Sequence, residues 1–183
     1  MDQKTVALLA NPAPGSHIVY SSSSDERVAS AIAHYATSGL EQGEAVILII
    51  TDSHRKAVLD LLKAEAYNVE RLESNGQLVF LDAAALLAEF TIDGMPDSEL
   101  FKNIIDRTIK KAGRDSGTGR SRGVRAFGEM VSLLWNGEPT AALGLEKLWN
   151  EVIEHHQIPL LCTYSLNCIP SEIACLHSHS FAA

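Results

Sequence analysis

Short apolar blocks alternate along the chain with longer stretches in which apolar residues recur at helical spacing. The blocks have the length of β-strands and lie at residues 17–20, 45–50, 77–81, 124–128 and 160–164. Residues 45–50 are apolar at every position, which is typical of an interior strand of a parallel sheet covered on both faces. The alternation predicts a single α/β domain with a doubly wound, mainly parallel sheet.

The stretches between the blocks predict helices. We place them at residues 25–41, 54–66, 83–90, 97–112 and 130–156, the last interrupted near Pro139, with a further short helix from Pro170. Residues 1–16 contain two prolines and a glycine after a short apolar stretch, so we predict an N-terminal arm or an edge strand there. Residues 17–183 then form the domain, with an exposed, mobile loop at 114–123.

Ligands of doubly wound folds bind beyond the carboxyl ends of the strands. The first of these ends is followed by four serines, then Asp25 and Glu26. A phosphate-binding loop needs glycine amides and a lysine, and this segment has neither. Two carboxylates at the start of a helix also repel an anion there. The sequence therefore predicts a degenerate phosphate loop, no catalytic machinery and no cofactor.

Composition narrows the class of protein further. The chain has 183 residues and a net charge of −8, which disfavours nucleic acid as a partner. No apolar run approaches the ~20 residues that span a bilayer, so we expect no membrane association. Three cysteines, an odd number, argue for a reducing compartment and hence a cytoplasmic location.

The charge is unevenly distributed. Residues 102–125 carry eight basic and two acidic side chains. Within this segment Arg114, Arg120 and Arg122 are candidates for docking an acidic partner protein. The alternative is that the segment docks no partner and is only a solvated helix face followed by a mobile tether.

Several stretches resemble one family, the MEDS domain, a sensory domain of methanogen and methylotroph DcmR regulators. The resemblance extends from about residue 17 to residue 179 and is carried by HIVY (17–20), GLEQGEAV (39–46), RAFGEMVSLLW (125–135), LEKLWN (145–150) and LCTY (161–164).

The resemblance implies a degenerate relative of RecA/KaiC-like ATPases that has lost the phosphate loop. Such domains occur alone or attached to histidine kinases or DNA-binding regulators, and are thought to sense small molecules such as dichloromethane. We therefore expect a non-catalytic sensory domain that binds a small organic ligand. With no output segment in its 183 residues, it would signal to a separate histidine kinase or regulator. Homo-oligomerisation stays open.

The predicted ligand-binding residues lie near strand ends or supply aromatic surface. They are Tyr20, Ser22, Arg125, Phe127, Glu129, Trp135, Cys162 and Tyr164. Each has a structural alternative: an ion pair or helix cap for the charged residues, and core packing for the aromatic residues and Cys162.

Two alternatives to the sensory function remain. One is a residual nucleotide-binding or hydrolysing KaiC-like enzyme that uses Glu129, and the other is an interaction module without a ligand. We predict no metal site. The weak contrary signal is the C-x-H-x-H pattern of Cys175, His177 and His179, whose side chains project to one face of an extended segment. They equally suit hydrogen bonding at a sheet edge.

Overall fold

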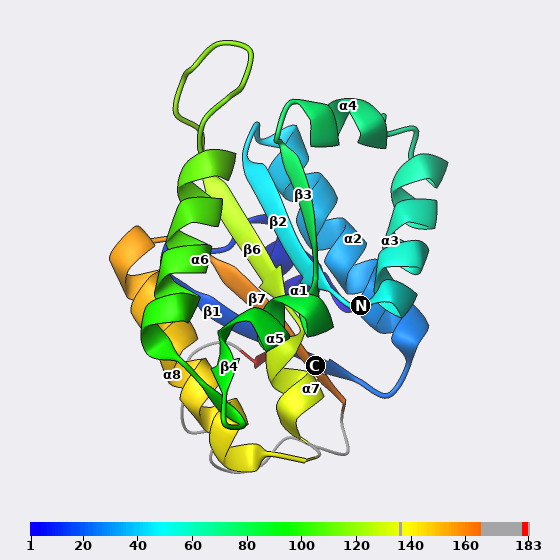
Figure 1. The fold of residues 1–183 in the computed structure, drawn as a ribbon. Coiled ribbons are helices and arrows are strands. Elements are labelled where there is room, and N and C mark those ends of the chain that lie inside the picture. Colours follow the sequence, from blue (N-terminus) through cyan, green and yellow to red (C-terminus); the bar gives the residue numbers. More distant parts are fainter. Residues whose placement is uncertain (136, 166–180, 183) are drawn as a thin grey trace.

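A six-stranded parallel sheet forms the centre of the computed structural model, which describes residues 1–135, 137–165 and 181–182. The strand order is β3-β2-β6-β7-β1-β8 (Figure 1). The strands are β1 (His17–Ser22), β2 (Ala45–Ile50), β3 (Leu78–Asp82), β6 (Val124–Gly128), β7 (Leu160–Ser165) and β8 (Phe181–Ala182). The predicted α/β class with a parallel sheet is confirmed.

Helices cover both faces of this sheet. On one face lie α1 (Gln3–Ala10), α2 (Asp25–Glu41), α3 (Asp52–Ala64) and α4 (Val69–Ser74). On the other lie α5 (Ala83–Phe90), α6 (Ser98–Ala112), α7 (Met130–Trp135) and α8 (Pro139–His156). A small hairpin of β4 (Thr91–Ile92) and β5 (Met95–Pro96) precedes α6. No helix among the described residues is long and apolar enough to cross a bilayer.

Strand β2 shows how the pattern of apolar residues builds the two cores. Its even-numbered residues face α2 and α3, and its odd-numbered residues face α5 to α8. All six residues are buried, because helices cover the strand on both sides. The prediction of an interior strand is therefore correct.

Residues 3–10 form helix α1, so the edge strand, one of the two alternatives predicted for residues 1–16, is wrong. Thr5 and Leu9, four residues apart, are the buried positions of this helix, a helical spacing that the short apolar stretch concealed. The Asp2 side chain caps the helix by accepting from the Thr5 amide at 2.8 Å. Strand β8 occupies the place beside β1. Helix α4 is a further element that the pattern did not predict, and the helix predicted from Pro170 lies outside the described residues.

Arg125 lies near the amino end of β6 and is buried, with 1% of its surface exposed. Its Nε donates to Glu44 at 2.5 Å, and its Nη1 donates to the carbonyls of Tyr35 at 3.0 Å and Leu9 at 3.4 Å. The guanidinium also lies 5.0 Å from the centre of the Tyr35 ring. Arg125 thus ties α1, α2 and β6 together at the sheet edge opposite the carboxyl ends.

The close approach of α2 to Arg125 depends on Gly39. A Cβ atom at this position would lie 2.5 Å from Nε and 2.6 Å from Cδ of Arg125. We expect Gly39→Ala to lower the free energy of unfolding by about 1–3 kcal/mol, because the buried guanidinium cannot move without breaking its bonds. Urea unfolding followed by circular dichroism measures the change.

Gly144→Ala is the matched control, because Gly144 also lies within a helix, α8. Its nearest neighbour to an added Cβ is Met95 Cε at 4.0 Å, which is ordinary contact. Alanine should therefore stabilise the protein at this position by up to about 1 kcal/mol. Equal effects of the two substitutions would show that Arg125 does not restrict Gly39.

Candidate functional site

Glu129 follows β6 at the carboxyl edge of the sheet, where it joins β6 to the start of α3. Its Oε2 accepts hydrogen bonds from the Thr51 amide at 2.7 Å and the Thr51 hydroxyl at 3.0 Å. Its Oε1 bonds Nδ1 of His54, in the first turn of α3. Only 3% of Glu129 is exposed. We call Thr51, His54 and Glu129 the edge site.

His54 and Glu129 form a hydrogen-bonded pair in the edge site. The hydrogen bond to Glu129 raises the pKa of His54 above its ordinary value of 6.5, although burial acts in the opposite direction. Asp25, whose Oδ1 lies 4.0 Å from His54 Nε2, adds to the rise. The protonated form of His54 is therefore favoured beside Glu129, at the place where doubly wound folds bind ligands.

The raised pKa makes the contribution of His54 to stability depend on pH. The native state binds the proton more tightly than the unfolded chain does, so the stabilisation is full below about pH 6.5 and is lost as the pH rises through the higher native pKa. We expect His54→Gln to lower the free energy of unfolding by about 1–2 kcal/mol at pH 6.

Above the native pKa of His54 the wild type and the variant should differ little. Urea unfolding of both proteins, repeated from pH 6 to above the native pKa of His54, isolates the contribution of His54 to the free energy of unfolding. The other titrating groups contribute equally in both proteins and cancel in the difference. A difference that grows with pH would contradict the assigned protonation.

The loop between β1 and α2 occupies the place of a phosphate loop. Only Ser23 and Ser24 separate the two elements. The Ser24 hydroxyl accepts from the Arg27 amide at 3.4 Å, and the Ser22 hydroxyl accepts from the Ser24 amide at 3.2 Å. Ser24 therefore caps the helix, and Ser22 holds the loop before it. Residues 21–26 form no glycine-rich cradle for phosphates.

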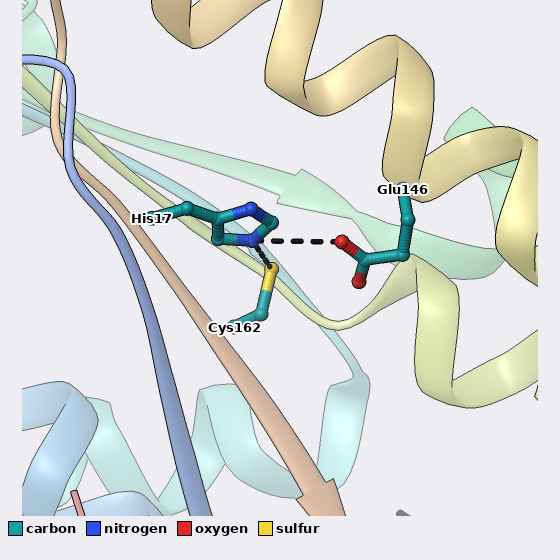
Figure 2. A group of neighbouring side chains, drawn as sticks. All are labelled: His17, Glu146 and Cys162. Carbon is teal, nitrogen blue, oxygen red and sulfur yellow. Dashed lines mark hydrogen bonds and ion pairs between the residues drawn. The ribbon is translucent and has the colours of Figure 1, made fainter. Parts of the chain in front are cut away.

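A second group of polar side chains lies inside the protein, between the sheet and α8. His17 begins β1, Cys162 lies on β7 and Glu146 lies on α8 (Figure 2). His17 Nε2 is 3.2 Å from Cys162 Sγ and 3.8 Å from Glu146 Oε2. His17 Nδ1 lies 2.9 Å from Asn150 Oδ1. We call His17, Glu146 and Cys162 the interior triad.

The interior triad contains a carboxylate in an apolar core, since Glu146 is 0% exposed. Burial of a charge is unfavourable without polar partners, and the Tyr164 hydroxyl supplies one by donating to Glu146 Oε1. Burial and the neighbouring Glu146 also raise the pKa of the Cys162 thiol well above its ordinary value. The neutral thiol form of Cys162 is therefore favoured.

The predicted ligand-binding residues do not form one pocket. Cys162 and Tyr164 face α8 with the interior triad, whereas Tyr20 and Phe127 belong to the core under α2 on the opposite face of the sheet. Side chains alternate between the faces of a strand, so proximity at a strand end does not bring them together.

The remaining predicted residues are also dispersed. Glu129 belongs to the edge site, and Ser22 bonds the loop before α2. Trp135, at the end of α7, packs against the core formed by α5 to α8. Arg125 lies at the opposite sheet edge from Glu129 and ties helices to the sheet.

Sequence reasoning missed the partners of these residues. Thr51 follows the end of a predicted strand, but neither it nor His54 indicated a partner, because both meet Glu129 only through the pairing of β2 with β6. Glu146, by contrast, did give a local signal in the sequence. Ala142, Glu146, Trp149 and Ile153 are all buried on α8, and a carboxylate within an apolar stripe at this spacing indicates a buried polar site.

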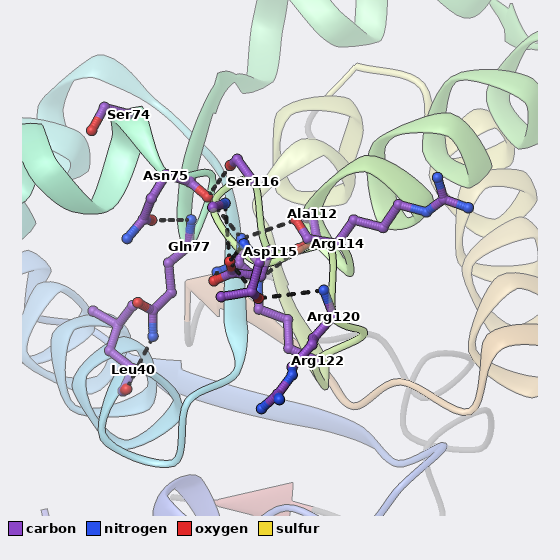
Figure 3. Close-up of polar contacts among 12 residues, drawn as sticks. Leu40, Ser74, Asn75, Gln77, Ala112, Arg114, Asp115, Ser116, Arg120 and Arg122 are labelled. Atoms are coloured by element: carbon purple, nitrogen blue, oxygen red, sulfur yellow. Dashed lines mark hydrogen bonds and ion pairs between the residues drawn. The ribbon is translucent and has the colours of Figure 1, made fainter.

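Residues 102–125, which we call the basic segment, border a groove of about 1260 Å³ at the amino edge of the sheet. The groove is lined in part by Lys110, Lys111, Arg114 and Arg122. Arg122 holds the loop in place, with Nε donating to the Ala112 carbonyl at 2.9 Å and Nη2 to the Asn75 carbonyl at 3.1 Å (Figure 3). Cys175, His177 and His179, whose pattern runs counter to the prediction of no metal site, lie outside the described residues.

Comparison with solved structures supports the fold. A KaiC-like protein from the hyperthermophilic archaeon Pyrococcus horikoshii OT3 is similar with a TM-score of 0.58 and 15% identity over 83% of this chain and 63% of that chain. The chain thus spans less than two thirds of that protein, and at this identity the likeness shows the fold alone. The predicted RecA/KaiC-like fold is confirmed.

Comparison by sequence identifies the family. No curated protein matches the chain. The family described as MEDS, the MEthanogen/methylotroph, DcmR Sensory domain, matches residues 16–179. The chain therefore belongs to the MEDS family of sensory domains.

Proposed function

We propose that the chain is a non-catalytic sensory domain that binds a small organic ligand at the edge site and passes the signal to a separate protein. The observation that carries this proposal is Glu129, a buried acidic side chain hydrogen-bonded to a histidine of raised pKa, at the edge where doubly wound folds bind ligands. Membership of a sensory family supports the role.

The edge site offers a mechanism for a response. Glu129 joins the end of β6 to the first turn of α3 through Thr51 and His54. A ligand that donates a hydrogen bond to Glu129 competes with these two residues and favours a state in which the start of α3 has moved. It shifts the population only if it binds that state more tightly.

The rival function is nucleotide hydrolysis, which the KaiC-like fold and the strand-end carboxylate both suggest. The two-residue connection between β1 and α2, with Asp25 and Glu26 in the first turn of the helix, argues against it. We expect no turnover of magnesium ATP by the purified protein in a phosphate-release assay. Turnover that Glu129→Gln abolishes would overturn the proposal in favour of an enzyme.

The basic segment supplies the proposed contact with an acidic partner, such as a histidine kinase or regulator. Arg114 and Arg120 are exposed, whereas Arg122 is needed for the loop itself. We expect Arg114→Glu with Arg120→Glu to weaken capture of a purified partner at least tenfold while leaving the melting temperature unchanged. Arg55→Glu, at a different exposed arginine, is the control. Equal capture by all three proteins would contradict docking through the basic segment.

A further inference from the structure

The interior triad brings a nitrogen, a sulfur and an oxygen donor to one point in the core (Figure 2). The three donor atoms all lie within 4.8 Å of one another. In a tetrahedral zinc site, bond lengths of about 2.0–2.3 Å place neighbouring donors about 3.3–3.6 Å apart. The Nε2–Sγ distance of 3.2 Å and the Nε2–Oε2 distance of 3.8 Å are within about half an ångström of these values.

Side chains next to the interior triad orient its donor atoms, as the side chains next to metal ligands do in known metal sites. A histidine that binds a metal through one ring nitrogen usually donates the other N–H to an acceptor. His17 Nδ1 lies 2.9 Å from Asn150 Oδ1, which leaves the lone pair of Nε2 directed toward Cys162 and Glu146. Tyr164 similarly holds Glu146 by donating to Oε1, while Oε2 is the oxygen that faces His17.

We propose that His17, Glu146 and Cys162 bind a divalent transition-metal ion, with Zn²⁺ the best match for mixed nitrogen, sulfur and oxygen donors. Binding forms a metal–thiolate bond and releases the Cys162 proton to solvent, without oxidation or reduction. The two charges of the ion balance one thiolate and one carboxylate, which accounts for a carboxylate in this core. With three protein ligands, the fourth ligand of a tetrahedral ion would be water.

A second group of possible ligands, Asp106, His155 and His156, lies at the surface among the described residues. Lys110 Nζ lies 2.6 Å from Asp106 Oδ2 and opposes a cation there. This surface group also contains no cysteine, so it cannot give a thiolate-to-cobalt band. It therefore provides a control that distinguishes weak surface binding from binding at the interior triad.

Cobalt(II) titration of the whole, chelator-treated protein tests the proposal, because Co²⁺ replaces Zn²⁺ and reports its ligands by absorption. We expect one Co²⁺ per chain, visible bands of a four-coordinate ion and a near-ultraviolet thiolate-to-cobalt band that Zn²⁺ removes. Cys162→Ser should abolish the thiolate band, and His17→Gln or Glu146→Gln should weaken binding at least tenfold.

Control variants distinguish metal binding at the interior triad from binding at other histidines and cysteines of the chain. His156→Gln should leave the titration unchanged, and Cys168→Ser with Cys175→Ser should keep the thiolate band. Circular dichroism checks that each variant folds. A thiolate band that persists in folded Cys162→Ser would overturn the assignment. Absence of the band in the wild type would overturn it without any variant, so the test does not depend on whether the variants fold.

Discussion

Arg125→Met should lower the free energy of unfolding by about 3 kcal/mol. Removal of one partner from a buried ion pair is typically destabilising by about 3–5 kcal/mol. Glu44 is 24% exposed at its side chain, so water can hydrate part of the released charge and the loss falls at the lower end of that range. Methionine retains most of the side-chain volume, which limits the contribution of a cavity.

The expected loss comes mainly from hydrogen bonds. Arg125 donates to the carbonyls of Leu9 and Tyr35 in addition to Glu44, and methionine cannot donate to any of them. Lysine keeps the charge but has no planar fork that serves several acceptors, so Arg125→Lys should recover only part of the loss.

Urea unfolding followed by circular dichroism measures both variants. Arg120→Met, at an exposed position, should change the free energy by no more than about 0.5 kcal/mol. A loss of less than about 1 kcal/mol for Arg125→Met would contradict the structural role of this residue.

Glu129→Ala should lower the free energy of unfolding by about 3 kcal/mol. The substitution removes two hydrogen bonds from Thr51 and the hydrogen bond with His54. Hydrogen bonds to charged groups contribute about 1.5–3 kcal/mol, and His54 then lacks its carboxylate. The link between the end of β6 and the start of α3 is lost.

Glu129→Gln separates charge from hydrogen bonding, because a glutamine oxygen still accepts from Thr51. We expect it to cost about half as much as alanine. Glu26→Ala, at an exposed position in α2, is the control and should have little effect. Thermal and urea unfolding measure all three, and equal losses for Glu26→Ala and Glu129→Ala would contradict the edge site.

Much of the fold could be predicted because periodicity reports burial. The wholly apolar block at 45–50 is β2, and the fourth block, 124–128, is β6, which Glu129 directly follows. The missing phosphate loop was also apparent, because the chemistry of a phosphate cradle requires particular residues at fixed spacing. Helix α1 was missed because eight residues are too few to distinguish helical from strand periodicity.

The functional groups were harder to predict because they depend on pairing between distant strands. His17 and Cys162 meet because β1 pairs with β7 in a register that places Val19 opposite Cys162. A register shifted by one residue would turn Cys162 to the other face. Arg125 lies near the start of β6 and Glu129 directly follows its end, so the two residues act at opposite edges of the sheet.

Ligand-induced thermal stabilisation tests the sensory function at the edge site most directly. A panel of short-chain alcohols and methylated amines, which can donate a hydrogen bond to Glu129, is screened against the wild type and Glu129→Gln. At a ligand concentration 100-fold above Kd, binding stabilises a protein by about 2.7 kcal/mol. We predict at least one compound that raises the melting temperature of the wild type and has little effect on Glu129→Gln. An equal rise in both proteins, or no rise with any compound, would contradict the account.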